Sequence, residues 1–436
     1  MPRGSDGSGR GAAQPADVSP AGDDGSDARV AAELAARTSY GRLVAYLAAR
    51  SRDVAAAEDA LGDAFAAALK TWPRIGVPDK PEAWLLTVAR RHLVDAARHA
   101  GVKAAGAATL RTAVLEAQQE ASWETVFPDE RLKLLFVCAH PAIDEAARTP
   151  LMLQAVLGLD AARIASAFLV APAAMGQRLV RVKARIRDAG IRFEIPARGE
   201  LPRRLQAVLD AVYAAYGSGW EDVAGADPRQ KGLAEEAIWL GRLLTRLLPE
   251  EPETHGLLAL MLHCEARRGA RRDATGRYVP LTRQDVALWS RPMIGEAERI
   301  LAAASHAGKP GRFQLEAAIQ SAHAERAVTG RTDWEAIALL YEGLIRMAPT
   351  IGARVAYAAA LAEVRGPDGG LAALDALPSD AVSTYQPYWA LRAHLLKRLG
   401  RATDAREAYA RAIGVSEDMA VRDFLARQAS AEGEDA

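Results

Sequence analysis

The stretch of sequence that decides the fold lies at residues 150–187 and reads PLMLQAVLGLDAARIASAFLVAPAAMGQRLVRVKARIR. Its apolar runs are interrupted near Gly158 and Pro172, residue types that disfavour a continuing helix. We therefore expect helices over residues 151–157, 161–169 and 173 to about 188, with breaks at 158–160 and 170–172. Short helices followed by a longer one across tight breaks are typical of a helix-turn-helix unit.

The third of these segments is both amphipathic and basic. Its apolar residues recur at the helical period and form one stripe, Met175, Leu179, Val182 and Ile186. Polar and basic residues flank that stripe, with Gln177, Arg178, Arg181 and Arg185 on one side and Lys183 and Arg187 on the other. A helix held by its apolar face can present arginines to a major groove, where they bond phosphates or guanine edges. DNA binding in transcription is therefore the first hypothesis, and a solvated charged face is the alternative.

Overall charge gives little support to this hypothesis, but local charge does. The chain has 436 residues, enough for two or three domains, and its 55 basic and 55 acidic residues cancel. Between residues 162 and 192, however, seven basic side chains are opposed only by Asp188. The segment after Gly414 is instead mainly acidic. Because local fields decide where a polyanion docks, the neutral sum does not exclude DNA binding.

Other functional classes find little support in the sequence. Cys138 and Cys264 are too far apart in sequence for a paired-cysteine motif, and neither they nor the nearby His140 and His263 have further ligands at useful spacing. We therefore predict no metal site, no cofactor and no catalytic residue, and a protein that is not an enzyme. No signal peptide or membrane-spanning run is found, which favours a cytoplasmic location.

The sequence of the whole chain predicts an all-α protein with several units. We expect a disordered N-terminus over residues 1–27, a helical domain over 28–99 with a proline-rich loop at 72–81, and a flexible linker over 100–128. A second helical domain is expected over 129–194, a boundary at 195–199, a larger helical domain over 200–429 and an acidic tail over 430–436.

An internal repeat marks the end of the larger domain. A shift of 34 residues places Gly366 on Gly400 and Leu361 on Leu395, and the 334–348 segment would supply a helix of a preceding unit. A helix-pair repeat of that length is typical of a tetratricopeptide array. We therefore expect stacked helix pairs near the C-terminus, and upstream of them the periodicity is too weak to count repeats.

The two N-terminal units together resemble the extracytoplasmic-function sigma factors of bacterial RNA polymerase. The first resembles their domain two through AEDA at 57–60, DAF at 63–65, Trp72, PEAWLLTVARR at 81–91, Asp95 and Arg98. The second resembles domain four through IASAF at 164–168 and AMGQRL at 174–179. The segment DERLKLLFVCAHPAI at 129–143 and the helical extension are similar to the subgroup with a tetratricopeptide-like C-terminal domain.

The resemblance implies core RNA polymerase and promoter DNA as partners, and it implies a role for particular residues. Core polymerase would bind Asp59, Asp63, Phe65 and Leu69. The minus-ten element would bind Trp84, Arg90, Arg91 and Arg98, with His92 nearby, and the upstream element would bind Gln177, Arg178, Arg181, Lys183 and Arg185. For Trp84, Phe65 and Leu69 a core-packing role is the alternative. The sequence departs from the family pattern at two places. Ala171 replaces the usual capping Ser or Thr, and few basic residues follow Arg98.

Two other functions stay open at this point. One is a helix-turn-helix regulator that never contacts polymerase, although such a regulator would not need residues 28–98. The other is a tetratricopeptide-type interaction protein derived from a sigma factor that no longer drives transcription. The C-terminal domain is expected to regulate activity or to dock a protein or peptide partner.

Overall fold

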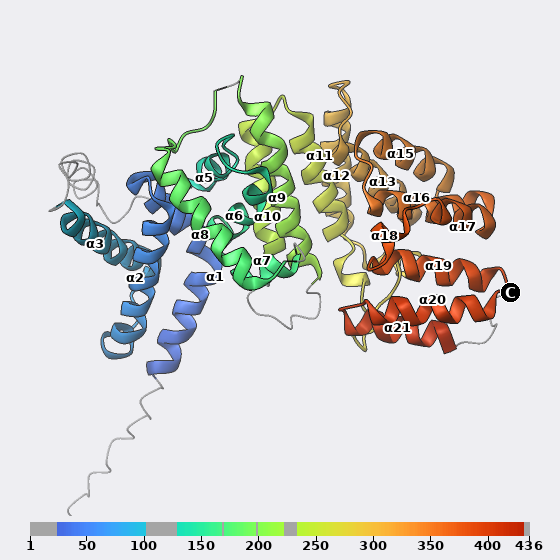
Figure 1. Ribbon diagram of the computed structural model, residues 1–436, viewed down its shortest axis with the longest axis horizontal. Helices are drawn as coiled ribbons and strands as arrows, with labels where there is room; N and C mark the ends of the chain where they lie inside the picture. The colour runs from blue at the N-terminus through green and yellow to red at the C-terminus, as the bar shows by residue number, and fades with distance from the viewer. Residues whose placement is uncertain (1–23, 102–128, 168–169, 198, 222–232, 431–436) are drawn as a thin grey trace, which may run out of the picture.

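The computed structural model describes residues 24–101, 129–167, 170–197, 199–221 and 233–430. The regular elements of these residues are helices, and one isolated bridge joins Arg272 to Tyr278. This confirms the predicted all-α class. The helices follow one another along an elongated body, from α1–α3 at one end to α19–α21 at the other (Figure 1).

The first unit consists of α1 (Asp24–Ser51), α2 (Val54–Ile75) and α3 (Pro81–Gly101). The α1 helix begins within the segment predicted to be disordered up to residue 27. Asp53 starts α2 by accepting a hydrogen bond from the Ala56 amide at 3.1 Å, a standard N-cap. The α2 helix continues through Pro73 and ends at Ile75, before Gly76, whose φ of 82° suits glycine, so the predicted loop is shorter than expected.

The second unit consists of α5 (Arg131–Cys138), α6 (Glu145–Ala155), α7 (Ala161–Ala167) and α8 (Pro172–Asp188). The helix predicted over 151–157 is wrong at both ends. Asp144 caps the earlier start by accepting from the Ala146 amide at 2.9 Å, and the helix stops at Ala155. The α8 helix lies where it was predicted. Ala171 offers its N-terminus no side-chain cap, as its sequence implied.

The remaining helices stack in chain order across the rest of the body (Figure 1). They are α9 (Leu201–Glu221), α10 (Leu233–Leu247), α11 (Pro252–Glu265), α12 (Arg291–Ser305), α13 (Arg312–Ala324), α14 (Arg326–Thr329), α15 (Trp334–Met347), α16 (Ile351–Arg365), α17 (Pro367–Asp375), α18 (Ser379–Val382), α19 (Gln386–Arg398), α20 (Ala402–Gly414) and α21 (Met419–Ser430). The α15 helix occupies the segment predicted for a helix at 334–348.

The helix pairs α16–α17 and α19–α20 have equivalent turns. Gly366 and Gly400 end the first helix of each pair with φ of 84° and 73°, a conformation that glycine adopts without strain. Leu361 and Leu395, at equivalent positions, are both buried. The 34-residue shift therefore relates two structurally similar helix pairs.

One hydrophobic core runs from α1 through α11 and includes residues of α12 and α13. It does not stop at the boundary predicted for residues 195–199. Arg131 of α5 is buried, with its guanidinium 2.7 Å from Asp129, paired with Glu236 and stacked 4.4 Å from the Trp239 ring centroid on α10. The second unit is therefore anchored to α9 and α10 and does not form a separate body.

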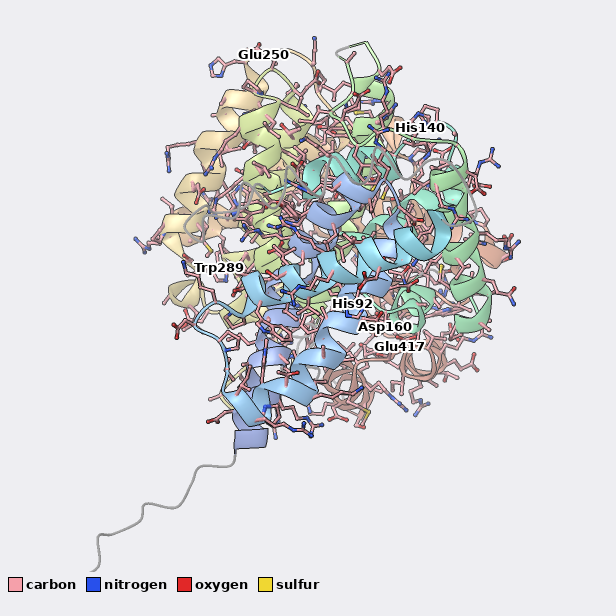
Figure 2. All side chains as sticks on the ribbon, turned by 90° about the vertical axis from the view of Figure 1, so that its left-hand side faces the viewer. His92, His140, Asp160, Glu250, Trp289 and Glu417 are labelled. Carbon is pink, nitrogen blue, oxygen red and sulfur yellow. The ribbon has the colours of Figure 1, made fainter. Side chains whose placement is uncertain are left out.

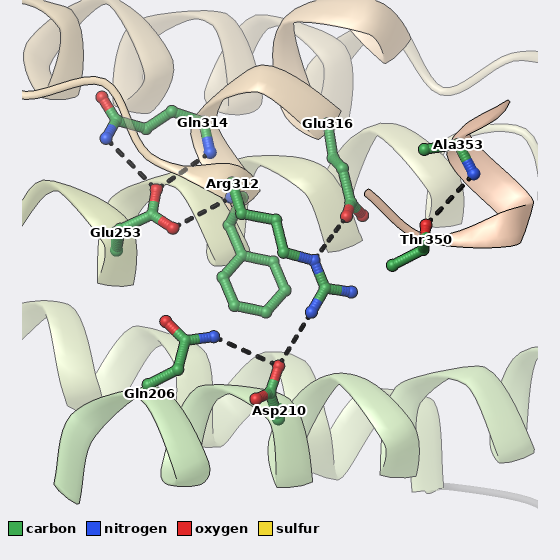
Figure 3. A network of polar contacts seen from close by, with 9 residues as sticks. Gln206, Asp210, Glu253, Arg312, Gln314, Glu316, Thr350 and Ala353 are labelled. Carbon is green, nitrogen blue, oxygen red and sulfur yellow. Dashed lines mark hydrogen bonds and ion pairs between the residues drawn. The ribbon is translucent and has the colours of Figure 1, made fainter. Parts of the chain in front are cut away.

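A carboxylate joins α11 to α13 (Figure 3). Glu253 accepts hydrogen bonds from the Phe313 amide at 3.0 Å and from the Gln314 amide at 3.1 Å, which satisfies two donors at the start of α13. A Cβ on Gly311 would lie 2.1 Å from the Glu253 carboxyl carbon, so only glycine fits there. Arg312 adds a bridge from α13 to Asp210 of α9 at 3.0 Å.

The irregular connection between α11 and α12 reaches the last helix of the chain. It contains η1 (Arg268–Ala270), η2 (Leu281–Arg283) and η3 (Val286–Leu288). Arg272 lies 2.6 Å from Asp418, and the Tyr278 and Phe424 rings meet edge to face at 5.5 Å. These contacts join the middle of the chain to the segment around α21.

Replacing Glu253 by Gln is expected to destabilise the junction of α11 and α13. Loss of a charged acceptor for buried amides costs on the order of 1–3 kcal/mol. Urea unfolding followed by circular dichroism measures the change, and Glu250→Gln, an exposed position nearby, is the matched control. Equal stability of the two variants would contradict this account of the cap.

The structure is expected to lose stability between pH 7 and pH 5. His263 of α11 is 1% exposed, and although Glu298 lies 3.5 Å from its Nε2, burial and the Arg267 guanidinium lower its pKa to about 4. The unfolded state binds the proton more tightly, so stability is full above the ordinary histidine pKa and falls as the pH drops toward 4. The contribution of His263 to this loss by pH 5 is about 2 kcal/mol.

Thermal unfolding at pH 7 and pH 5 measures that loss. His263→Leu isolates it because other histidines, His323 among them, also have lowered pKa values through burial. The variant should lose less stability on acidification than the unchanged protein. The same loss in both proteins would contradict the assignment to His263.

Candidate nucleic-acid interface

The helices of the first unit meet through two tryptophans. The rings of Trp72 on α2 and Trp84 on α3 pack edge to face, with centroids 5.5 Å apart. Trp72 is fully buried, and Trp84 is half-buried against the core. In this conformation Trp84 therefore helps to hold α3 on α2, the packing role named as its alternative.

The predicted minus-ten residues on α3 fall into different environments. Arg90 hydrogen-bonds the Tyr46 hydroxyl of α1, and its guanidinium lies 5.0 Å from the Tyr46 ring centroid. Arg91 and His92 are exposed, and α3 lies across the end of the molecule nearest the viewer in Figure 2. The side chain of Arg98 lies outside the described residues. Arg91 is thus the predicted cation on α3 that the structure places in solvent.

The predicted polymerase-binding residues of α2 differ in exposure. Asp59 and Asp63 are exposed, and Leu69 is 49% exposed although it is apolar. Phe65 is half-buried against the core. Asp63 lies 3.6 Å from the His92 ring of α3. Asp59 and Asp63 therefore share one exposed side of α2, and Leu69 is exposed on another side of the same helix.

The α8 helix has the two faces that its sequence predicted. Met175, Leu179, Val182 and Ile186 are all buried, which confirms the apolar stripe. Gln177, Arg181 and Arg185 are exposed and Arg178 is half-buried. A shallow hollow on the exposed face is lined by Ala173, Gly176, Gln177, Val180 and Arg181. This basic, sterically open face can meet a polyanion.

Two basic residues of α8 contact α2 instead of solvent. Lys183 Nζ lies 2.5 Å from Glu58 Oε2, with side chains only 11% and 13% exposed, and Arg187 lies 3.8 Å from Asp53. Lys183, predicted to contact DNA, therefore does not reach solvent in this conformation. The signal for this difference was present in the sequence, because Lys183 and Arg187 lie on the flank of the stripe opposite Arg178 and Arg181.

Glu58 is the interface residue that the sequence analysis did not single out. Burial raises its pKa, and the Lys183 ammonium offsets part of that rise. Burial and the nearby Glu58 carboxylate also raise the pKa of Tyr40 and of the Cys138 thiol. The carboxylate thus lies in a poorly solvated space between the first and second units, where its charge depends on Lys183.

The backbones of the first and second units also approach each other closely. A Cβ on Gly41 of α1 would lie 1.8 Å from the Val156 carbonyl oxygen at the end of α6. Gly158, with φ of 69°, faces the Tyr40 ring in the same way. Such close approach requires glycine, so the sequence is adapted to this packed arrangement.

Several kinds of site find no support in the described part of the chain. None of its groups of His, Cys, Asp and Glu could hold a metal ion. Its helices include none long and apolar enough to cross a membrane. Cys138 and Cys264 are both buried free thiols.

Two segments of the chain match families of known proteins. Residues 36–102 match the family described as Sigma-70 region 2, and residues 204–305 match a family of unknown function, DUF6596. An uncharacterised protein of Rhizobium meliloti (strain 1021) is 39% identical over 381 residues, which cover 86% of this chain and 90% of that protein. The chain belongs to the family of that protein and carries a sigma-70 region 2 domain. No solved structure matches.

Each matched segment corresponds to a group of consecutive helices in the structure. The Sigma-70 region 2 segment covers most of α1 and all of α2 and α3, and the DUF6596 segment covers most of α9 and all of α10–α12. The second unit, α5–α8, lies between them in sequence and contacts both, through Glu58 on one side and through α9 and α10 on the other.

Gly41→Ala is expected to destabilise the packing of the first unit on the second. The added methyl group would collide with a backbone carbonyl that cannot rotate away, and overpacking of this kind costs about 1–3 kcal/mol. Gly62→Ala is the matched control, because a Cβ at that exposed α2 position meets nothing within 4 Å. It should be neutral or stabilising by about 0.5–1 kcal/mol. Thermal unfolding distinguishes the two, and equal effects would contradict the close crossing.

Proposed function

We propose that the protein is an RNA polymerase sigma factor of the extracytoplasmic-function type, which binds core polymerase and directs it to promoters. The observation that carries this proposal is the sigma-70 region 2 match over residues 36–102. A helix with an open basic face, α8, follows in the same chain. A DNA-binding regulator with α8 alone would have no use for the first unit.

In this proposal one group of residues binds core polymerase, and two other groups each bind one promoter element. Asp59, Asp63, Phe65 and Leu69 of α2 bind core polymerase. Trp84, Arg90, Arg91 and Arg98 on α3 bind the minus-ten element, with stacking on bases and cations on phosphates. Gln177, Arg178, Arg181 and Arg185 on α8, a helix-turn-helix recognition helix, bind the upstream element, and Lys183 joins them once it is free of Glu58.

The C-terminal half supplies a scaffold and a docking surface. We expect its stacked helix pairs, which are tetratricopeptide-like in the 34-residue spacing of Gly366 and Gly400, to bind a protein or peptide partner or to regulate activity. Stacked helix pairs form extended surfaces of a kind that suits peptides.

A second candidate function rests on Trp84 and Arg90. Both residues engage in internal packing, with Trp72 and with Tyr46, and neither lies free in solvent. If those contacts persist on polymerase, the chain is an interaction protein derived from a sigma factor and does not open promoters.

Mixing the full-length protein with core polymerase separates these functions. Co-elution together with run-off transcripts from candidate promoters supports the sigma factor. Co-elution without transcripts supports the interaction protein, and the absence of both contradicts the proposed function.

The double variant Arg178→Ala with Arg181→Ala is expected to weaken promoter binding at the upstream element and to leave co-elution with polymerase nearly intact. Each lost contact costs about 1–3 kcal/mol and lowers the salt dependence of binding. Electrophoretic mobility shifts at several salt concentrations measure both effects. Arg192→Ala, a control for charge at a residue whose side chain is 75% exposed, should change binding little. Equal losses in the two proteins would argue against base or phosphate contacts by α8.

A further inference from the structure

The exposed face of α8 carries an apolar side chain that the fold does not use. Val180 lies between the basic residues Arg178 and Arg181 in the sequence, and 66% of it is exposed. An exposed helical position favours alanine over valine, because a branched side chain loses rotamer freedom in a helix. Neither burial nor helix formation therefore accounts for a valine at this position.

Val180 borders the shallow hollow on α8. The other lining residues are Ala173, Gly176, Gln177 and Arg181. The alanine, the glycine and the valine have no polar side-chain atom, whereas the glutamine and the arginine can donate hydrogen bonds. A Cβ on Gly176 would meet nothing within 4 Å in the described part of the chain, so the protein leaves space there. The hollow therefore offers an apolar contact directly beside hydrogen-bonding groups.

The hollow lies in the N-terminal half of α8, where the charges favour a polyanion. Arg178 and Arg181 form no ion pair with the residues that the structure describes. Near the C-terminal end, by contrast, Arg187 lies 3.1 Å from Asp188 and 3.8 Å from Asp53, which offset its charge. Phosphates are attracted to unpaired arginines, and recognition helices contact base edges through their N-terminal residues. The occupant that fits this hollow is a base edge of duplex DNA.

Valine and glutamine match the two halves of an A·T base pair. In the major groove thymine presents its 5-methyl group, which accepts apolar contacts, and adenine presents N7 and N6, which glutamine can bond together. Gln177 and Val180 are separated by ~4.5 Å along the helix axis. Because successive bases on a strand are ~3.4 Å apart, the two side chains can reach one base pair or two neighbouring ones.

We propose that Val180 and Gln177 select an A·T base pair in the upstream element, with Val180 against the thymine methyl group and Gln177 bonded to the adenine edge. This step rests on the proposed function, in which α8 binds that element. It adds Val180 to the residues assigned to the upstream element, and it assigns a particular base to Gln177. Arg178 and Arg181 provide affinity, and the hollow between them and Ala173 provides the choice of base pair.

Selection of duplexes followed by replacement of single chemical groups tests this assignment. The full-length protein, alone and with core polymerase, selects from a library of DNA duplexes with a random central segment. The selected duplex is then the probe in mobility-shift titrations. Replacing a T·A pair by U·A removes only the methyl group. Replacing it by 5-methylcytosine·guanine keeps the methyl group and removes the adenine.

One T·A pair of the probe, or two neighbouring ones, should respond to these replacements. Loss of the methyl group should weaken binding about fourfold, and loss of the adenine should weaken it about 5- to 150-fold. Val180→Ala should abolish the first effect and keep the second, and Gln177→Ala should do the reverse. Val328→Ala, the matched control at an exposed valine of α14, should behave like the unchanged protein. Circular dichroism of each variant reports whether the helices are retained.

The proposed readout would be overturned if no duplex were selected, if no replacement of thymine by uracil weakened binding, or if Val180→Ala still distinguished the two bases. A preference for adenine that survived Gln177→Ala would contradict the role of Gln177.

Run-off transcription from the selected duplex with core polymerase tests the sigma-factor function separately. A lack of transcripts contradicts that function even where the thymine methyl group is read. Transcripts from a duplex without a methyl-sensitive pair support the function and overturn the readout by Val180.

Discussion

The structure depends on a buried ion pair between two helices far apart in sequence. Lys183 of α8 and Glu58 of α2 meet where neither side chain is well solvated. Each charge in such a place is tolerated only because the other is present. The pair holds one flank of α8 against the sigma-70 region 2 unit, and it keeps Lys183 away from solvent.

Helix type and helix faces were predictable from the sequence, whereas contacts between units were not. The apolar stripe from Met175 to Ile186 gave the buried face of α8, because a period of 3.6 residues determines which side chains share a face. The stripe also left Lys183 and Arg187 on a separate flank. Their partners, Glu58 and Asp53, lie more than a hundred residues away, and no local pattern connects residues at that separation.

Helix ends and domain boundaries were the least predictable features. The start of α6 depends on Asp144 as a cap, a residue outside the apolar run that suggested the helix. The segment at 195–199 has the proline and glycine expected of a boundary. The core nevertheless continues past it, because Arg131 and Arg204 connect α5 with α9 and α10. Proline and glycine in a sequence indicate where the backbone turns, but they do not determine which helices pack against each other after the turn.

The anchoring of α5–α8 also changes how the C-terminal half should be studied. A truncation after Gly199 would remove Glu236 and Trp239 from buried Arg131, and it would expose apolar residues of α5 and α6. Loss of activity would then report unfolding rather than regulation. Substitutions on the surface of α15–α21 leave this junction intact and are the better approach to the role of the repeats.

The most direct test of the central claim is an electron cryomicroscopy map of the full-length protein bound to core polymerase and promoter DNA. The account predicts α3 and Arg181 of α8 against promoter DNA, and the Asp59 and Asp63 side of α2 against polymerase. A map in which Arg181 lies away from DNA, or in which the chain binds polymerase through its C-terminal helices alone, would contradict it.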